Sequence, residues 1–378
     1  MDKLQYLTAL FSVVSNRIVD GFSQLIVNCQ LSIVNCRALC SGLFLLLLCS
    51  CASYHYVSIE SFNPAVITFP EELRRVLIVN NALPQEEVPF ESTMRQLPDS
   101  IIIIADSTTF DFCNMLGEAL AEFQGFDDVR LLEGCFRKDS SPLSALTLKR
   151  EEVEQLCDEH EVDVVISLDR LLFRLNEYEG EVSGIDITGL INVEVSGVLR
   201  VYIPTRDTPM TTILLSDTIT PNTWMNWYNL DFWDLYFDFD PTNLIRESAR
   251  YNAYEARKHF VPYWIQDVRW YYVSFESQWK EASAYAESEK WDEALAIWLK
   301  LYDRTSSRKQ KARLASNIAL GEELTGDLEK ALEYATIAYQ YMLHYLGEDD
   351  ALTKKQEVYV RVLSSRVAEN PKLRLQMR

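Results

Sequence analysis

The chain has 378 residues, with 56 acidic and 36 basic side chains, and its formal net charge at pH 7 is −20. So acidic a surface repels nucleic acid and anionic lipid headgroups, which makes polyanion binding an unfavourable function for it. The length suggests about two domains. No nucleic-acid partner is therefore expected.

The segment that ends at Cys51 has the layout of an export signal. Arg37 is a short basic flank, and uncharged, mostly apolar residues follow from Ala38 to Leu48. A transmembrane helix needs about 20 apolar residues, so we expect this shorter stretch to be removed after export rather than to span a membrane.

The residues upstream of this signal include the sequence Ile-Val-Asn-Cys at 26–29 and again at 33–36. They indicate a start site assigned too early. The alternative is a short helix, but two heptad-spaced copies are too few for a coiled coil. Residues 1–50 are therefore set aside as signal peptide and mis-assigned start, and residues 51–56 are interpreted as a tether.

The end of the signal, Leu48-Cys49-Ser50-Cys51, resembles the bacterial lipobox. That resemblance implies acylation of Cys51, which would become the new N-terminus; Cys49 fits less well because bulky Leu48 precedes it. Ala52 and Ser53 resemble outer-membrane sorting residues. The resemblance implies a lipoprotein on the periplasmic face of the outer membrane, in preference to the inner membrane or the cell surface. Several acyl chains hold a protein stably, whereas one chain binds marginally.

Three cysteines besides Cys51 lie downstream of the signal: Cys113, Cys135 and Cys157. One pair could form a disulfide in an oxidising compartment, but their spacing fits neither a disulfide framework nor a zinc site. We favour their interpretation as small buried apolar residues.

Residues 57–220 are predicted to form an α/β domain. Apolar, β-branched runs at 75–80, 101–105, 129–132 and 162–168 indicate strands, and the patterns around 112–123 and 153–157 indicate helices. Alternating residues at 191–203, with an irregularity near Gly197, and at 211–219 indicate a hairpin. The expected fold is therefore a mixed sheet covered by helices.

Catalytic and cofactor motifs are absent from the sequence. No glycine-rich phosphate loop and no G-x-S-x-G nucleophile elbow occurs, and the four histidines do not have metal-ligand spacing. Asp163 and Asp169 flank a predicted strand and are candidate catalytic carboxylates, although acids at strand ends are more often turn residues. We expect a protein that is not an enzyme and that holds no cofactor or metal.

Residues 221–242 form an aromatic segment between Pro221 and Pro241. Aromatic rings beside carboxylates are suited to sugars, because the rings stack on the apolar face and the acids accept hydrogen bonds. The favoured interpretation is instead a connector that packs the two halves together. The candidate glycan-binding residues are Trp224, Trp227, Trp233, Asp231 and Asp234.

Residues 243–378 have helical composition throughout. Two groups of small and aromatic residues resemble tetratricopeptide repeats, with Ala294 and Ala331 in equivalent places, close to the repeat length of about 34 residues. Glu322 departs from the pattern, which expects an aromatic residue there. Helices at about 243–260 and 351–367 are expected to complete the stack; the alternative is an irregular bundle. The two groups are Ala282, Tyr285, Trp291, Ala294 and Trp298, and then Ala319, Gly326, Leu328, Ala331, Ala335 and Ala338.

The combination of lipobox, α/β domain and repeat-like helices resembles uncharacterised lipoproteins of the Bacteroidota. The resemblance carries no catalytic residue across. We expect a membrane-anchored periplasmic protein that acts as an interaction or assembly module and binds a protein partner through its helical domain. The alternative is a glycan-binding or cell-wall-binding lipoprotein.

Overall fold

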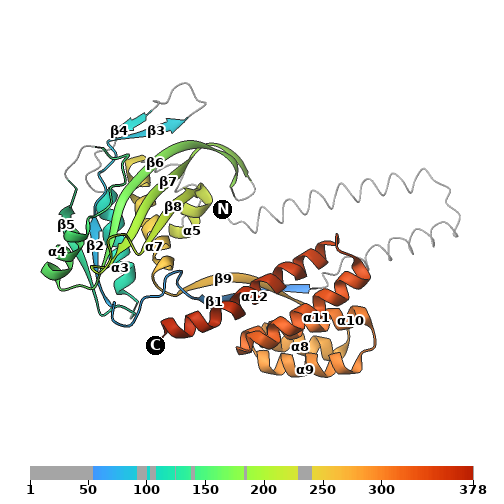
Figure 1. Ribbon diagram of the computed structural model, residues 1–378. Helices are drawn as coiled ribbons and strands as arrows, with labels where there is room; N and C mark the ends of the chain where they lie inside the picture. The colour runs from blue at the N-terminus through green and yellow to red at the C-terminus, as the bar shows by residue number, and fades with distance from the viewer. Residues whose placement is uncertain are drawn as a thin grey trace, which may run out of the picture.

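The computed structural model describes residues 54–91, 100–102, 108–123, 125–137, 141–182, 185–228 and 241–377. It contains a sheet lobe and a helical lobe, joined by a two-stranded ribbon (Figure 1). The mixed sheet followed by a helical region confirms the expected α+β fold class.

The sheet lobe is built on strands β2 to β8, and its longest strand, β6, pairs along both edges. Strands β5, β2 and β6 are parallel, and the later part of β6 also pairs in parallel with β3, which carries the short antiparallel β4. On the other edge, β7 and β8 add antiparallel strands and form the predicted hairpin. The strands are β2 (Arg75–Asn80), β3 (Glu87–Glu91), β4 (Ser100–Ile102), β5 (Asp128–Cys135), β6 (Val164–Val182), β7 (Ile185–Tyr202) and β8 (Thr211–Ile219).

Helices cover both faces of this sheet, because β2 is apolar on both sides. Val76 and Ile78 pack with α3 (Thr108–Ala121) and α7 (Pro241–Ala256). Leu77 and Val79 point to the opposite face, where they pack with α4 (Arg150–His160). A strand buried on both faces reads as a continuous apolar run, which is why the sequence pattern identified it. Short α5 (Pro221–Tyr228) follows β8.

The position of α7 corrects the sequence prediction. The helix expected from about residue 243 forms, but it packs against α3 and the sheet, with Ile245, Ala249 and Ala253 fully buried in that core. It does not join the repeat-like stack. Its small residues permit close approach to α3, a pattern that looks the same in sequence as the alanines of a repeat.

A second correction concerns the ribbon, which follows the short helix η1 (Arg257–His259). Strand β9 (Tyr263–Tyr272) pairs antiparallel with β1 (Tyr54–Asn63), with Tyr54 opposite Tyr272. Helix was expected throughout this region, and the strand was missed. Its aromatic and β-branched residues favour a strand, but its pairing partner lies more than 200 residues earlier, outside any local pattern.

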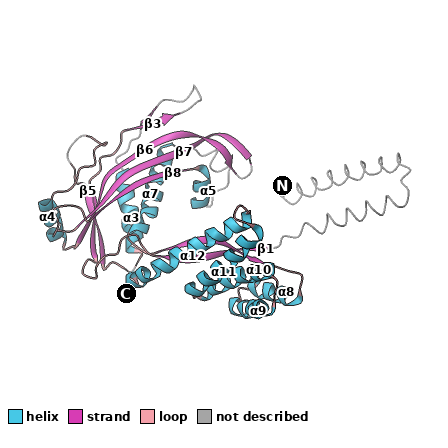
Figure 2. Ribbon diagram, turned by 45° about the vertical axis from the view of Figure 1, so that its right-hand side comes forward, coloured by secondary structure: helices cyan, strands magenta, loops and turns pink. Residues whose placement is uncertain are grey.

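The helical lobe consists of two helix pairs followed by the long α12, which packs on α11 (Figure 2). Ser307, Asp327 and Asp350 cap the starts of α10, α11 and α12 by accepting backbone hydrogen bonds. Gly326 ends α10 with φ of +97°, a left-handed conformation that glycine adopts without strain. The helices are α8 (Ser277–Glu287), α9 (Trp291–Arg304), α10 (Arg308–Thr325), α11 (Leu328–Leu346) and α12 (Ala351–Gln376).

Candidate functional site

The ribbon is fixed to the helical lobe by a polar side chain on α10. The Asn317 side chain accepts a hydrogen bond from the Tyr272 amide at 2.6 Å and donates one to the Tyr272 carbonyl at 2.8 Å. Both partners are buried. Asn317 therefore satisfies both backbone groups of the last residue of β9, much as a neighbouring strand would. The chain's own ribbon lies against α10, the central helix of the stack.

A buried ion network makes the second connection between ribbon and helices. Glu323 on α10 accepts hydrogen bonds from Arg269 on β9 at 3.1 Å, from Tyr359 on α12 at 2.7 Å, and from Arg366 on α12. Its side chain is 1% exposed, so its charge depends on these partners. Burial, followed by the charge of Glu323, raises the pKa of Tyr359 well above its ordinary value. The network joins three elements and positions α12.

Helix α12 continues beyond the stack and reaches the sheet lobe at its C-terminal end. There Gln376 accepts a hydrogen bond from the Ala65 amide at 2.8 Å, and its amide donates to Ala65, Ile67 and Thr68. Lys372 donates to the carbonyl of Val66. These contacts tie the end of the helical lobe to the loop that follows β1.

A groove of about 560 Å³ lies beside this contact, between the two lobes. Leu375 of α12 and Met377, which follows the helix, line it and are 53% and 56% exposed. Clefts between lobes with apolar linings are frequent ligand and partner sites. Its lining from the sheet lobe is mixed: it includes apolar Ile67, Phe69, Leu73, Phe123, Phe126 and Phe260 and charged Glu71, Arg74 and Glu122.

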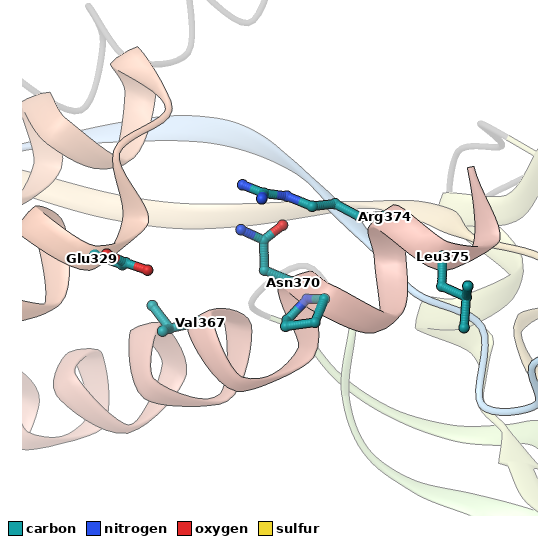
Figure 3. A pocket seen from close by; sticks show the side chains of 6 residues that line it. Glu329, Val367, Asn370, Arg374 and Leu375 are labelled. Carbon is teal, nitrogen blue, oxygen red and sulfur yellow. The ribbon is translucent and has the colours of Figure 1, made fainter. Parts of the chain in front are cut away.

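A second hollow, of about 370 Å³, lies along α12 near the start of α11 (Figure 3). Glu329 of α11 and Leu375 of α12 lie at opposite ends of it in this view, with Val367 and Asn370 of α12 between them, and Pro371 also lines it. Pro371 has no amide hydrogen, so it cannot make the helical hydrogen bond to Val367. The hollow therefore lies at the point of α12 where a proline removes one backbone hydrogen bond of the helix.

In the sheet lobe, the carboxyl ends of the parallel strands hold a buried acid. Asp169 is the extra residue of a bulge in β6, because Leu168 pairs with Leu199 while Arg170 pairs with Val198. The bulge lies opposite Val198 and Leu199, next to Gly197, near which the sequence predicted an irregularity. An added Cβ at Gly197 would lie 2.9 Å from the Arg170 carbonyl oxygen.

The carboxylate of Asp169 is fully occupied by donors from its own chain. Asn81 and Ser167 donate to one oxygen at 2.8 and 2.6 Å. Arg200 pairs with the other, which also accepts a hydrogen bond from the Tyr202 hydroxyl at 3.4 Å. Burial raises the pKa of Asp169, while the hydrogen bonds of Ser167, Asn81 and Arg200 act to lower it. These contacts tie Asp169 to β7 and to the residue that follows β2.

The same donors also hold the segment that leads into α4. Asn81 donates to the Leu146 carbonyl, Arg200 donates to the Ala145 carbonyl, and the Leu148 amide donates to Tyr202. Asp169 therefore organises a covering segment over the strand ends. A hollow of about 580 Å³ beside it has a mixed lining, with polar Asn81, Arg137 and Lys149 and apolar Leu132, Phe136 and Leu146 among its residues.

Asp163, the other candidate carboxylate, lies at the opposite end of the parallel strands. It precedes β6 and pairs with Arg75 at the start of β2, at 2.6 Å. Asp169 lies six residue steps further along the chain, which corresponds to about 20 Å in a strand. The structure does not bring the two acids together.

Comparison with known families gives the first classification. A family model described as a domain of unknown function, DUF8603, matches residues 73–272, more than half of the chain. The chain belongs to this family. A second model, for the domain of unknown function DUF6340, matches residues 280–365. The DUF8603 match includes α7 and β9, so the two matches divide between residues 272 and 280, whereas the sequence placed the division at about 243. No curated protein matches the chain.

Solved structures show only weak likeness to this DUF8603 protein. The PelC dodecamer from Paraburkholderia phytofirmans is 9% identical with a TM-score of 0.25, covering 54% of this chain and 96% of that one. The hypothetical protein CT253 from Chlamydia trachomatis is 15% identical with a TM-score of 0.24, covering 49% and 97%. A neuraminyllactose-binding hemagglutinin homologue from Helicobacter pylori is 11% identical with a TM-score of 0.22, covering 51% and 85%. Scores this low carry no functional argument.

The candidate glycan-binding residues of the DUF8603 region are only partly described. Trp224 is 2% exposed and packs in the core of the sheet lobe, so its ring presents no face to a sugar in this conformation. Trp227 lies in α5, and nothing is described of its side chain. Asp231, Trp233 and Asp234 lie outside the described residues, as does Cys51.

The three downstream cysteines have free thiols: Cys113 and Cys157 are buried, whereas Cys135 is exposed. Burial raises the pKa of Cys157 to about 11, as expected for a small apolar packing residue.

Among the described residues, no cluster of three or more potential metal ligands occurs. In the same part of the chain, no helix has the length and apolar character required to cross a bilayer.

Sequence reasoning missed the residues that join the lobes, namely Asn317, Glu323, Arg269 and Gln376. One signal was available. Glu322 breaks the repeat pattern, and it lies beside Glu323 on a stretch of α10 that is buried on nearly all sides. A pair of acids inside a buried helix predicts an internal ionic partner.

Proposed function

We propose that this protein is a lipid-anchored interaction module of the bacterial cell envelope, acylated at Cys51 and facing the periplasm from the outer membrane. The observation that carries the proposal is the position of β1. Its first residue, Tyr54, follows Cys51 by three residues and pairs with Tyr272, which Asn317 fixes to the helical stack. A tether at Cys51 would therefore hold the helical lobe close to the membrane.

The repeat-like packing supports an interaction role. Ala294 and Ala331 are fully buried, and an added Cβ at Gly321 would lie 3.1 Å from Leu295, so α9 and α10 approach closely. Rigid helix pairs of this kind present extended surfaces to partners. Because the ribbon lies against α10, the available surface is on the outer helices, where Leu343 of α11 and Val358 of α12 are 39% and 48% exposed.

Site-specific photo-crosslinking in intact cells tests the partner. A photoreactive residue replaces Leu343 or Val358, and Leu143, an apolar residue of the sheet lobe that is 67% exposed, is the matched control. We expect one adduct of defined mass at the two helical positions and none at Leu143. An identical pattern at all three positions, or no adduct at any, contradicts binding through the helical lobe.

Labelling with an alkyne fatty acid tests the tether. Label should be incorporated into the wild-type protein and lost in Cys51→Ala, whereas Cys49→Ala, which removes the poorer lipobox candidate, should retain it. Equal labelling of Cys51→Ala and wild type contradicts acylation at Cys51.

Glycan binding, the alternative function, gains no support from the buried Trp224.

A further inference from the structure

One face of the ribbon is buried, and the other face is open over part of its length. In an antiparallel pair, directly opposed residues share a face, and the face alternates along each strand. Ile59, Ser61 and Arg269 are 5%, 1% and 6% exposed, which marks the face that packs on the helices. The opposite face is open at Tyr56 and Val268, each 62% exposed, and at Trp264, 61% exposed. At the end near Tyr54 this face is covered, because Trp270 and Tyr272 are 7% and 1% exposed and pack in the core of the helical lobe.

The open face has aromatic side chains near both ends and polar side chains between them. Trp264 stacks on Phe62, with ring centroids 4.8 Å apart, and Tyr56 lies under the ammonium group of Lys355 at 4.4 Å. Glu60 and Gln266, opposed in the register, are exposed between these ends. Tyrosine and tryptophan combine an apolar ring with a polar group, and they concentrate at the interface between lipid and water.

The chain that precedes the ribbon indicates what this face contacts. A chain extends by at most about 3.6 Å per residue, so Cys51 lies within about 11 Å of Tyr54. Acyl chains on Cys51 would hold this end of the ribbon at the bilayer surface. We propose that the open face of the ribbon, defined by Tyr56, Phe62, Trp264 and Val268, rests on the phospholipid headgroup layer. This proposal rests on the acylation of Cys51 proposed above.

Charge decides which kind of lipid contact is available. The net charge of −20 opposes attraction to anionic headgroups, and Glu60 on the face itself acts in the same direction. The contact is therefore made by partition of the aromatic rings rather than by electrostatic attraction. A neutral phosphatidylcholine surface suffices, and added salt has little effect because no charge pairing is involved.

Tryptophan quenching by brominated lipid tests this contact. Full-length lipidated protein is reconstituted into phosphatidylcholine vesicles with or without brominated acyl chains. We expect bromine to quench part of the emission, and Trp264→Phe to lose at least half of that quenched part. Trp291→Phe, in α9, should keep it. The quenching should be the same in 0.1 and 0.5 M salt.

A rescue experiment excludes a general effect of the substitution on folding. In the Trp264→Phe background, Val268→Trp places a new indole on the same face and should restore quenching. Phe275→Trp, at a position 75% exposed but beyond the ribbon, should not. Equal quenching of wild type and Trp264→Phe, or rescue by both added tryptophans, overturns the membrane contact. These outcomes would not contradict the proposed acylation of Cys51. That proposal is contradicted by a separate result, unchanged fatty-acid labelling of Cys51→Ala.

Discussion

Asn317 on α10 hydrogen-bonds both the amide and the carbonyl of Tyr272, the last residue of β9. One side chain in the middle of a helix thereby replaces the pairing strand that this end of the ribbon would otherwise need. Through this contact the ribbon packs on the helical lobe. The DUF8603 match nevertheless includes β9 together with the sheet lobe.

The buried ion network should be a major contributor to the stability of the helical lobe. Glu323→Ala leaves Arg269 buried without its main partner, so we expect a loss of about 3 to 5 kcal/mol in the free energy of unfolding. Denaturant unfolding of the full chain measures it. Glu333→Ala, at an exposed position on α11, is the control and should change stability by less than about 0.5 kcal/mol. Equal losses for both variants contradict the role of the network.

The alanines of the repeat-like pairs should not tolerate enlargement. Ala294→Leu and Ala331→Leu insert bulk at fully buried positions, and each should cost about 1 to 3 kcal/mol through overpacking. Lys309→Ala, which removes an exposed side chain on α10, should stay within about 0.5 kcal/mol of wild type. Indistinguishable unfolding curves for the three variants show that the alanines are not interhelical contacts.

The contact of α12 with the sheet lobe should be visible at a single amide. Gln376→Ala removes the acceptor for the Ala65 amide, so we expect faster hydrogen exchange at Ala65, while the core of β2 remains protected. Each lost hydrogen bond contributes about 0.5 to 1.5 kcal/mol. Arg374→Ala, an exposed neighbour on α12, should leave the exchange rate at Ala65 unchanged. Unaltered exchange in Gln376→Ala contradicts the clamp.

Acid sensitivity should depend on the ion pair at the start of the parallel strands. The hydrogen bond from Arg75 lowers the pKa of Asp163 below its ordinary value of 3.8. Because the folded pKa is the lower one, the pair stabilises the protein above about pH 4, and this contribution is lost as the pH falls through the folded pKa. Asp163→Asn should therefore lower stability at pH 7, by about 1 kcal/mol or less for so exposed a pair, and have a smaller effect at pH 3. The same loss at both pH values contradicts this assignment.

Local sequence patterns predicted the elements whose partners lie nearby in the chain or whose burial is visible as an apolar run. The apolar run at Val76–Val79 and the alternation in β7 indicated a buried strand and a hairpin, and both are confirmed. The β1–β9 ribbon was not predictable in this way, because it pairs residues from distant parts of the chain. The helix α7 was predicted, but its packing partner was not: a helical pattern does not specify which surface covers the helix.

The candidate sites show the same limit. Asp169 was identified from its position after an apolar run, yet its burial depends on a bulge and on donors from two other segments, the residue after β2 and strand β7. Gln376 is an ordinary polar residue near the end of a helix, and only the folded chain places it beside Ala65. Cys51 was identified from sequence alone and remains a prediction.

The most direct test of the proposed anchored module is membrane fractionation after a carbonate wash. The wild-type protein and Cys49→Ala should remain with the membranes, whereas Cys51→Ala should be released because it lacks the acyl chains. Trp264→Phe should behave as wild type, since several acyl chains alone suffice for stable attachment. If Cys51→Ala remains as firmly membrane-bound as the wild type, the protein is not held by a lipid on Cys51, and the account of the ribbon as a membrane-proximal element is contradicted.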